Sequence, residues 1–373
     1  MRRTGVANLP LHPGKAPPWL FKRMVKLSRG ITGVLLYEYG PDEVLRRLAD
    51  PYWFQALSCV LGFDWHSSGC STVTCGALKE ALNPDLGLAI AGGKGKASRQ
   101  TPAEIAVYAE HYGLSSGSCD RLQYCSRMAA KVDNAAIQDG HTLYHHVFFL
   151  AENGSWAVVQ QGMNQATQYA RRYHWLGQDV KSFVCEPHQA IMGEDHPEVV
   201  LDMTAKPSSS AQKVAVDLVN DHPSHLLHDW ATLTTSSTQK TLDDWTSSTP
   251  ASTPMVLSMP RTINWKRMKE IYDVHPTNYE ELLALKGVGP GTIRALALIS
   301  DLIYGEKPSW DDPVRYSFAH GGKDGVPRAV DRDFMDESTE IIRQGVLEAN
   351  LGQTEKLQAL KRLRDFLPPT PIT

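Results

Sequence analysis

The sequence predicts an α+β protein: an N-terminal mixed α/β domain with a sheet centred on a β-hairpin, followed by an all-helical C-terminal domain. Two β-rich runs, residues 143–150 and 155–161, flank the dipeptide Asn153-Gly154, which is typical of hairpin turns. Apolar residues recur at helical spacing in residues 280–304 and 340–367. Between these regions, residues 231–254 contain 13 Ser or Thr in 24 positions. We therefore predict domains at residues 1–204 and 261–367, joined by a Ser/Thr/Pro-rich linker or insertion at 205–260.

Length and charge limit the possible functions. With 373 residues, the chain is long enough for two domains that each bury a core. A formal net charge of -3 excludes a broadly basic coat for nucleic acid, so any DNA contact must come from local basic patches. No apolar run has the length of a signal-peptide core or a membrane span, so we expect a cytoplasmic protein with no membrane partner. The six cysteines are expected to be reduced, with a Cys/His zinc site as the alternative.

The first elements are expected to be helices. Helices are predicted from about Trp19, from Pro41, and over residues 51–62, where Gly62 ends the helix. A polar loop at 64–69 follows, before a helix expected at 74–83. Because site residues often lie in polar loops after buried elements, Asp64 and His66 are candidate catalytic residues. Helix capping by Ser or Thr is the alternative interpretation of this loop.

A glycine-rich basic loop follows a short apolar strand expected at residues 86–91. Residues 92–99 contain three glycines and three cations, which favours a loop that binds phosphate through exposed N–H groups and point charges. Lys94 and Lys96 are therefore candidate phosphate ligands. The alternative is a flexible basic loop.

Two more helices are expected before the hairpin. Thr101, Pro102 and Glu104 have the arrangement of a capping box with proline at the first helical position. A longer helix is predicted over residues 120–138, and it carries Asp133.

The hairpin presents polar side chains that suggest a site. His146, Gln161, Asn164 and Arg171 lie on or next to its strands. The order of His146 and Asn164 is similar to a phospholipase-D-type phosphodiesterase half-motif, which implies that His146 is a nucleophile and Asn164 a phosphate ligand. The lysine of that motif is replaced by Phe148, so the cation would have to come from Lys94, Lys96 or Arg171.

Residues 280–298 contain a turn with paired glycines between two short apolar helices. Glycine lets a phosphate approach the main chain, Pro290 suits a first helical position, and the following N–H groups form an anion site. The stretch resembles the helix-hairpin-helix motif of repair nucleases, DNA glycosylases, ligases and polymerases, with Val288 as the apolar plug. That resemblance implies binding of the DNA backbone without reading of sequence. An ordinary αα-corner is the alternative. The expected DNA contacts are Lys286, Gly287, Gly289, Gly291, Thr292 and Arg294.

A second candidate DNA contact follows the paired glycines. Aromatics, glycines and cations alternate in residues 310–328, so Arg315 and Lys323 are further expected contacts. A buried interdomain loop would have a similar composition.

Over nearly its full length, apart from residues 205–260, the chain resembles a prokaryotic family that is known as a domain of unknown function. The resemblance brings no assigned activity. It is carried by Leu9-Pro-Leu-His12, Asp64-Trp-His-Ser-Ser-Gly69, Gly92-Gly-Lys-Gly-Lys96, Leu143-Tyr-His-His146, Val159-Gln-Gln-Gly-Met-Asn164, Arg172-Tyr-His-Trp175 and Arg315-Tyr-Ser-Phe-Ala-His-Gly-Gly-Lys323.

These features predict a DNA-processing enzyme, namely a DNA repair nuclease or phosphodiesterase. In one mechanism His146 is nucleophile or general base, and nearby cations neutralise the phosphate. In another, Asp64 and Asp133 bind a divalent metal such as Mg or Mn.

Two alternatives remain open. The first is a DNA glycosylase, by resemblance to a superfamily whose catalytic aspartate follows the hairpin at about the distance of Asp311 or Asp312. Its base pocket would be lined by Tyr316, Phe318 and His320. The second is a non-catalytic DNA-binding protein.

Overall fold

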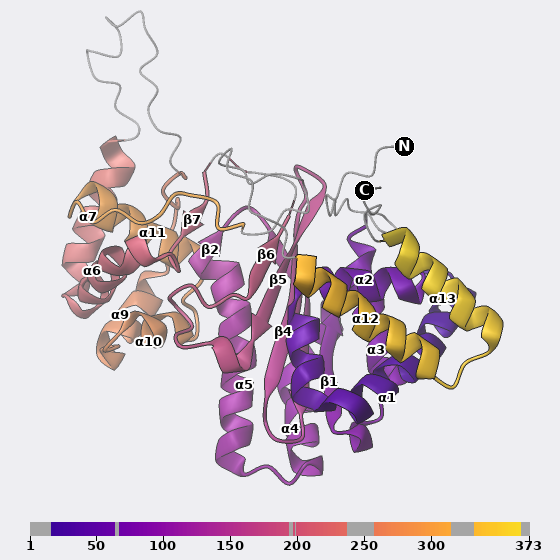
Figure 1. Ribbon diagram of the computed structural model, residues 1–373. Helices are drawn as coiled ribbons and strands as arrows, with labels where there is room; N and C mark the ends of the chain where they lie inside the picture. Colours follow the sequence, from indigo (N-terminus) through magenta and orange to yellow (C-terminus); the bar gives the residue numbers. More distant parts are fainter. Residues whose placement is uncertain are drawn as a thin grey trace, which may run out of the picture.

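A computed structural model describes residues 16–63, 67–193, 197, 199–236, 257–314 and 332–366 (Figure 1). These residues form a mixed α and β structure around an antiparallel five-stranded sheet of order β1-β3-β4-β5-β6. The predicted α+β class is confirmed at this level. The strands are β1 (Leu88–Lys94), β3 (Thr142–Ala151), β4 (Trp156–Asn164), β5 (Tyr169–Leu176) and β6 (Ala190–Met192), and a small second sheet pairs β2 (Ile137–Gln138) with β7 (Leu201–Asp202).

The predicted hairpin lies at the centre of the sheet. β3 and β4 pair directly, and the turn between them contains Gly154 with a φ of 87°. Successive side chains point to opposite faces, so Val147 and Phe149 enter one core while Phe148 enters the other. Because helices cover both faces, β3 is apolar without a break from Val147 to Ala151.

One face of the sheet is covered by helices from both ends of the chain. Gly40, with a φ of 76°, divides the first helix just before Pro41, and Gly62, with a φ of 99°, ends the second, as the sequence predicts. The helices on this face are α1 (Pro18–Ala49), α2 (Pro51–Leu61), α3 (Gly69–Ala81), α12 (Arg332–Glu348) and α13 (Gln353–Phe366).

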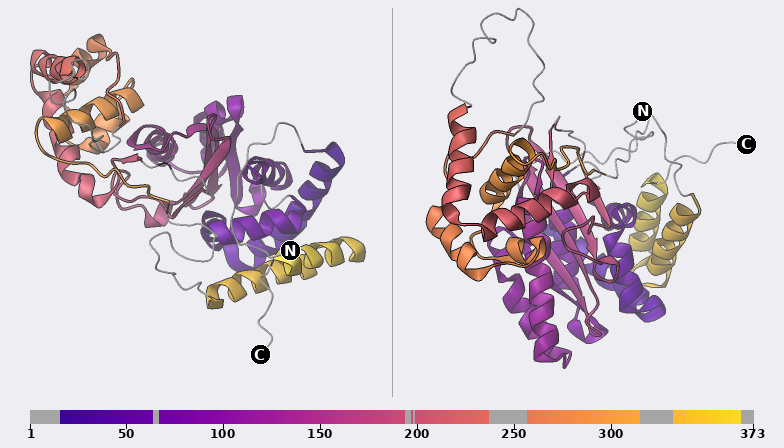
Figure 2. Two further views of the ribbon diagram at one scale, coloured as in Figure 1. Left: turned by 90° about the horizontal axis from the view of Figure 1, so that it is seen from above. Right: turned by 90° about the vertical axis from the view of Figure 1, so that its left-hand side faces the viewer.

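The other face carries α4 (Thr101–His111) and α5 (Ser116–Lys131), and a lobe of short helices packs beyond them. That lobe contains α6 (Ser209–Asn220), α7 (Pro223–Ser236), α9 (Trp265–Val274), α10 (Tyr279–Ala284) and α11 (Pro290–Leu302). A π-helical turn, Val132–Ala136, joins α5 to β2. Seen from above, the sheet separates the two groups of helices (Figure 2, left).

The predicted linker is corrected in its first half. Residues 209–236 form α6 and α7, and α6 buries Ala215, Leu218 and Val219 in the core that it shares with α11. These residues have i, i+3, i+4 spacing, which the Ser/Thr count over residues 231–254 hid. Residues 237–256 lie outside the described residues.

The single helical domain predicted at 261–367 is also wrong. α12 and α13 pack on α1 and α2, across the sheet from α10 and α11 (Figure 1). Ile342 and Val346 are fully buried in that core, and Gly345 lets α12 approach Ile31 and Leu35. The last two helices therefore complete the N-terminal core.

The capping box predicted at Thr101 is wrong as well. A 3₁₀ turn, Gly95–Gln100, leads into α4, so Thr101 is already helical, and its hydroxyl donates to Ser98 O at 2.8 Å. The carboxylate of Glu104 accepts instead from the Gly92 N–H and from Lys79 Nζ, both at 2.6 Å. Within the described residues, no helix has both the length and the apolar character needed to cross a membrane.

Candidate functional site

A polar band crosses both faces of the sheet, next to its apolar centre. On the α5 face, His146 is in register with Gln160, and Gln160 with Tyr173. On the opposite face the corresponding row is Lys94, His145, Gln161 and Arg172. The paired His-His and Gln-Gln dipeptides therefore serve two separate faces, because alternate strand residues point in opposite directions.

On the α5 face, His146 bonds to side chains through both ring nitrogens. Its Nδ1 lies 2.7 Å from Gln160 Oε1, and its Nε2 lies 2.9 Å from Ser126 Oγ of α5. The Gln160 amide nitrogen donates to Ala129 O at 3.0 Å and to the carboxylate of Asp133. The resulting chain runs from Ser126 through His146 and Gln160 to Asp133.

This network fixes the tautomer of His146. Both partners of the Gln160 nitrogen are oxygens that can only accept, so the other amide atom must be the oxygen. That oxygen accepts from Nδ1–H of His146, which leaves Nε2 as the acceptor for the Ser126 hydroxyl. Burial lowers the pKa of His146, although Gln160 and Asp133 oppose that shift. The ring is therefore a neutral base near pH 7.

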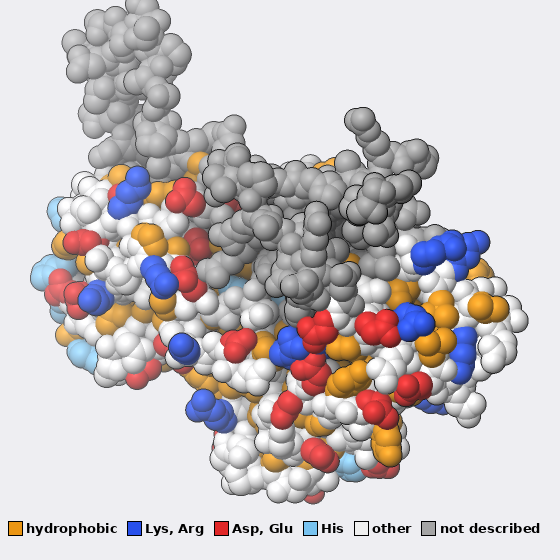
Figure 3. Space-filling model, in the orientation of Figure 1, with side chains coloured by type: hydrophobic (Ala, Val, Ile, Leu, Met, Phe, Trp, Pro, Cys, Tyr) orange, Lys and Arg blue, Asp and Glu red, His pale blue; other side chains and the backbone are white. Residues whose placement is uncertain are grey.

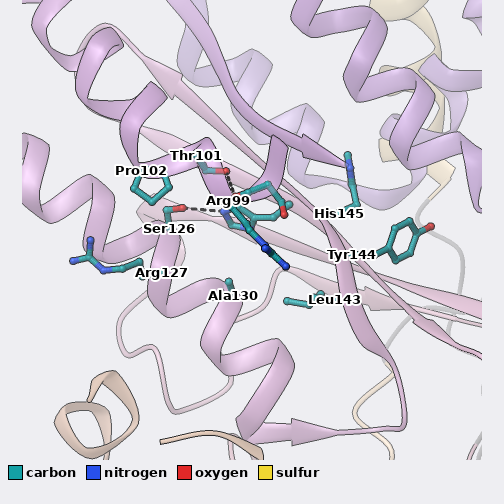
Figure 4. Close-up of a pocket in the computed structure, with 11 residues that line it drawn as sticks. Arg99, Thr101, Pro102, Ser126, Arg127, Ala130, Leu143, Tyr144 and His145 are labelled. Atoms are coloured by element: carbon teal, nitrogen blue, oxygen red, sulfur yellow. Dashed lines mark hydrogen bonds between the residues drawn. The ribbon is translucent and has the colours of Figure 1, made fainter. Parts of the chain in front are cut away.

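Ser126 and His146 line a cavity of about 190 Å³ between α4, α5 and β3 (Figure 4). Arg99 and Arg127 are exposed and also line it, but the Arg127 guanidinium points away from Ser126 (Figure 4), so Arg99 supplies the positive charge next to the cavity. Tyr144 and His145 lie across the pocket from Ser126 (Figure 4). The pocket thus combines a hydroxyl, a neutral imidazole and a cation that can receive an anion.

Asp133, a candidate metal ligand, is fully buried by partners. Its carboxylate accepts from Gln160 and from the Trp175 indole at 3.0 Å, and it bonds to His188. Asp64, its expected companion, lies outside the described residues, as does His66. Within the described part of the chain, no three His, Cys, Asp or Glu side chains are grouped to hold a metal.

Two other candidates belong to different surroundings. Gln161 points to the opposite face, where it donates to Ser68 O at 2.8 Å and bonds to Ser71 and Tyr144, so it attaches α3 to the sheet. Asn164 lies four residues beyond Gln160 on β4, about 13 Å along the strand. Its side chain accepts from the N–H of Ala166 at 2.9 Å and serves a turn.

Arg171 is held in a buried ion-pair network rather than in the pocket. Its guanidinium bonds to both carboxylate oxygens of Asp312, at 2.9 and 2.8 Å, and to Asp139 at 3.2 Å. Tyr173 also donates to Asp139, at 2.6 Å. Lys94 stands over the Tyr144 ring, 5.6 Å from its centroid, and Lys96 is exposed in the adjoining turn. Only these lysines, among the expected cations, are near the band and exposed.

Ser126 is the site residue that the sequence reasoning missed. It lies seven residues before Asp133, on the face of α5 that otherwise buries Leu122, Cys125 and Ala129. Two polar residues at i and i+7 on a buried helical face would have been the signal, because they share one side of the helix.

The paired-glycine turn, residues 285–291, joins α10 to α11 at the surface. Val288 is buried, whereas Lys286, Gly287 and Pro290 are exposed. Gly287 has a φ of 87°, which favours glycine, and a Cβ at Gly289 or Gly291 would meet nothing within 4 Å. The turn therefore leaves its main chain open at Gly289 and Gly291, whereas the Arg267 side chain lies against Gly287. Arg315 and Lys323 lie outside the described residues.

α5 docks this turn through Lys131. The Lys131 ammonium donates to the carbonyls of Leu283, Leu285 and Val288, at 2.6, 2.5 and 3.0 Å. Burial, and then Arg267, lower the pKa of Lys131 to about 8. Lys131 is one helical turn beyond Arg127 of the pocket, about 6 Å along the axis. One helix therefore joins the pocket to the paired-glycine turn.

Gln138 supports the start of α11. It donates to Pro290 O and accepts from Arg294 Nε, both at 2.8 Å. Arg294 is therefore used in docking, and Lys286 is the exposed cation at the turn. Elsewhere on the face seen in Figure 3, cations and carboxylates are interspersed, in agreement with the net charge of -3.

Replacing Lys131 by methionine is expected to lower the free energy of unfolding by about 2–3 kcal/mol, because three partly buried carbonyls lose their donor. Urea unfolding of the full chain measures it. The matched control is Lys286→Met, because Lys286 is an exposed lysine of the paired-glycine turn itself. This change should alter the free energy of unfolding by less than about 0.5 kcal/mol. Equal effects of the two changes would contradict the docking role.

His145 should make the fold sensitive to acid. Within the described residues neither ring nitrogen has a hydrogen-bond partner, and burial, with His146 and Lys94, lowers its pKa to about 3. Below about pH 6.5 the unfolded chain binds this proton while the folded chain does not, so stability falls by about 1.4 kcal/mol per pH unit. Chemical denaturation at several pH values measures this. The free energy of unfolding of His145→Gln should depend on pH less steeply than that of wild type, by about 1.4 kcal/mol per pH unit. An unchanged slope would show that His145 is protonated in the fold.

Comparison with known proteins gives a family without an activity. A family model with the description "Protein of unknown function (DUF763)" matches residues 5–330. No curated protein and no solved structure matches the chain.

Proposed function

The chain belongs to the family described as protein of unknown function (DUF763), and from its own geometry we propose that it is a DNA-processing enzyme that cleaves phosphodiester bonds. We propose a DNA repair nuclease in particular. The observation that carries this proposal is the pocket on α5, where the neutral His146 and the Ser126 hydroxyl face a cavity lined by Arg99 and Arg127. The same helix holds the paired-glycine turn.

The paired-glycine turn would bind the DNA backbone. α11 begins at Pro290, so the N–H groups of Gly291 and Thr292 lie in its first turn, where no intrahelical acceptor exists. These groups and the helix dipole favour a phosphate, and the open glycines let it approach. Lys286 adds an exposed charge. Contacts of this kind position a duplex and carry no sequence information.

The pocket would supply the chemistry. His146 can accept a proton through Nε2, since Gln160 holds its other nitrogen as a donor. Guanidinium groups bind phosphate oxygens well, and Arg99 would stabilise charge that develops on them in the transition state. Because Arg127 and Lys131 lie on one side of α5, a strand held at the turn can reach the cavity.

The geometry disfavours Asp312 as the catalytic aspartate of a glycosylase, whereas Asp311, the other candidate, is exposed. In a glycosylase of the resembled type the catalytic aspartate must be available to the substrate, whereas the carboxylate of Asp312 is bound on both oxygens by Arg171. Asp312→Asn would abolish base release if that alternative were correct, and His146→Ala would not.

The test is incubation of the full chain with end-labelled single-stranded, nicked, flap and damaged duplex DNA. Each substrate is tested with Mg²⁺, with Mn²⁺ and with a chelator. Strand cleavage is the expected result. Abasic products without cleavage would indicate a glycosylase, and retention of unchanged DNA would indicate a binding protein, and either result overturns the proposal.

Lys286→Ala is expected to weaken DNA binding uniformly across sequences and to reduce the slope of log affinity against log salt by about 1. One phosphate contact is lost, and its counterion is no longer released. Fluorescence anisotropy at several salt concentrations measures it. Lys361→Ala, an exposed lysine on α13 across the sheet, is the control and should leave the slope unchanged. Identical slopes for both variants would place the DNA elsewhere.

A further inference from the structure

We propose that Ser126 is the nucleophile of this pocket, so that cleavage passes through an intermediate in which the DNA phosphate is esterified to Ser126. The proposal deepens the proposed function and rests on it for the identity of the substrate. The activation of Ser126 rests only on the pocket itself.

The first support is the direction of each hydrogen bond. Ser126 Oγ lies 2.9 Å from His146 Nε2, the nitrogen that carries the lone pair. Gln160 keeps that tautomer in place from 2.7 Å on the other side of the ring. Hydroxyl, imidazole and orienting group therefore follow the order used by serine hydrolases of unrelated folds, with an amide as the third member.

The second support is how the three residues are positioned. The Gln160 amide is held by Ala129 O and by Asp133, which lie on α5 and in the π-helical turn that follows it. Ser126 lies on the same helix. π-helical turns inside helices occur frequently at functional sites. One continuous segment thus places both the hydroxyl and the group that orients its base.

The third support is access. Ser126 is only 2% exposed, yet it lines the 190 Å³ cavity together with the exposed Arg99 and Arg127. A serine that only stabilised the fold through His146 would need neither the cavity nor the exposed Arg99 that lines it. This cation selects an anionic substrate, which favours phosphoryl over acyl transfer.

The reaction is balanced as two displacements at phosphorus. In the first, Ser126 Oγ forms a bond to phosphorus, the bond from phosphorus to a deoxyribose oxygen breaks, and the hydroxyl proton moves to His146 Nε2. The leaving oxygen takes a proton from water, and the resulting hydroxide accepts the proton of His146. In the second, a water oxygen forms a bond to phosphorus and gives a proton to His146 Nε2, while the bond from phosphorus to Ser126 Oγ breaks. His146 returns that proton to Ser126 Oγ, and the DNA leaves with a terminal phosphate. No oxidant or reductant is required.

The test has one readout without DNA and one with it. A fluorophosphonate, which phosphonylates activated serines, is incubated with the full chain, and the modified residue is found by peptide mass spectrometry. Wild type is expected to carry one adduct, at Ser126, and His146→Asn should react at least about 100-fold more slowly. Ser116→Ala, an exposed serine of the same helix, is the control and should be labelled as wild type is. Separately, a reaction with end-labelled DNA is stopped with detergent during turnover. In denaturing gel electrophoresis, part of the label should then migrate with the protein.

The outcomes separate the two proposals. An adduct at Ser126 without cleavage of any DNA would support Ser126 as an activated nucleophile and overturn the proposal that the protein is a nuclease. If Ser126→Ala cleaves DNA at the wild-type rate and wild type forms no adduct, Ser126 is not the nucleophile, while the proposal of a nuclease stands. If Ser126→Ala does not fold, Ser126→Cys replaces it: iodoacetamide should alkylate this cysteine faster than Cys125, and loss of that preference when His146→Asn is added confirms activation by His146.

Discussion

Replacing His146 by asparagine is expected to lower the rate of DNA cleavage on the order of 10³-fold, because the pocket loses its only neutral base bonded to Ser126. The matched control is His174→Asn, which replaces another buried histidine of the sheet, on β5. His174 is not among the residues that line the pocket, and its Nδ1 lies 3.3 Å from Leu48 O of α1 on the opposite face of the sheet, so its replacement should change the rate by less than about threefold. Steady-state cleavage of an end-labelled substrate measures both.

Two checks guard this result. Circular dichroism must show that His146→Asn keeps the wild-type fold, since the histidine is also buried in the network with Gln160. The DNA affinity of His146→Asn should equal that of wild type, because the proposed DNA-binding site lies at the paired-glycine turn. Normal cleavage by His146→Asn, or an equal loss of cleavage in His174→Asn, would show that His146 is not the base.

The pH dependence of wild type gives an independent measurement on the same residue. Burial lowers the pKa of His146 below its ordinary value, so the neutral, basic form persists as the pH falls through about 6.5. The rate constant kcat/KM should therefore stay level across that pH and decline only in more acidic solution. A decline with its midpoint near pH 6.5 would mean that an exposed histidine is the base.

The sequence supported those parts of the fold that depend on local patterns. The hairpin followed from β-rich runs around Asn153-Gly154, and the helix boundaries followed from Pro41, which suits a helix start, and from Gly62, which has a positive φ and ends a helix. His146 became a candidate because polar side chains cluster on and next to a hairpin whose strands are otherwise apolar. These inferences needed no knowledge of which segments meet in space.

The rest depended on tertiary contacts. Ser126 is a candidate only because it bonds to His146, which lies twenty residues away on another element. Nothing in the sequence around a helical serine indicates such a partner. α12 and α13 were assigned to the wrong lobe for the same reason: their amphipathic pattern shows that they bury a face, but not which core receives it. Sequence pattern thus predicted elements better than their neighbours.

Arg171 shows why tertiary contacts matter for assigning function. Its charge suggested a phosphate ligand, but in the structure its partners are two carboxylates. Asp139 and Asp312 lie 32 and 141 residues from it in sequence. We expect Arg171→Met to lower the free energy of unfolding by about 3–5 kcal/mol, since it leaves both carboxylates without their buried cation. Guanidinium unfolding followed by fluorescence measures the loss.

The control for Arg171→Met is Arg343→Met, which breaks an exposed pair with Glu340 on α12 and should cost less than about 1 kcal/mol. Adding Asp312→Asn to Arg171→Met should recover part of the stability, because one of the unpaired charges is removed. If Arg171→Met instead retains wild-type stability and loses only DNA cleavage, the ion-pair interpretation is wrong and Arg171 acts on the phosphate. Stability and activity therefore decide between the two roles, because a buried pair that supports the fold must affect unfolding whether or not DNA is present.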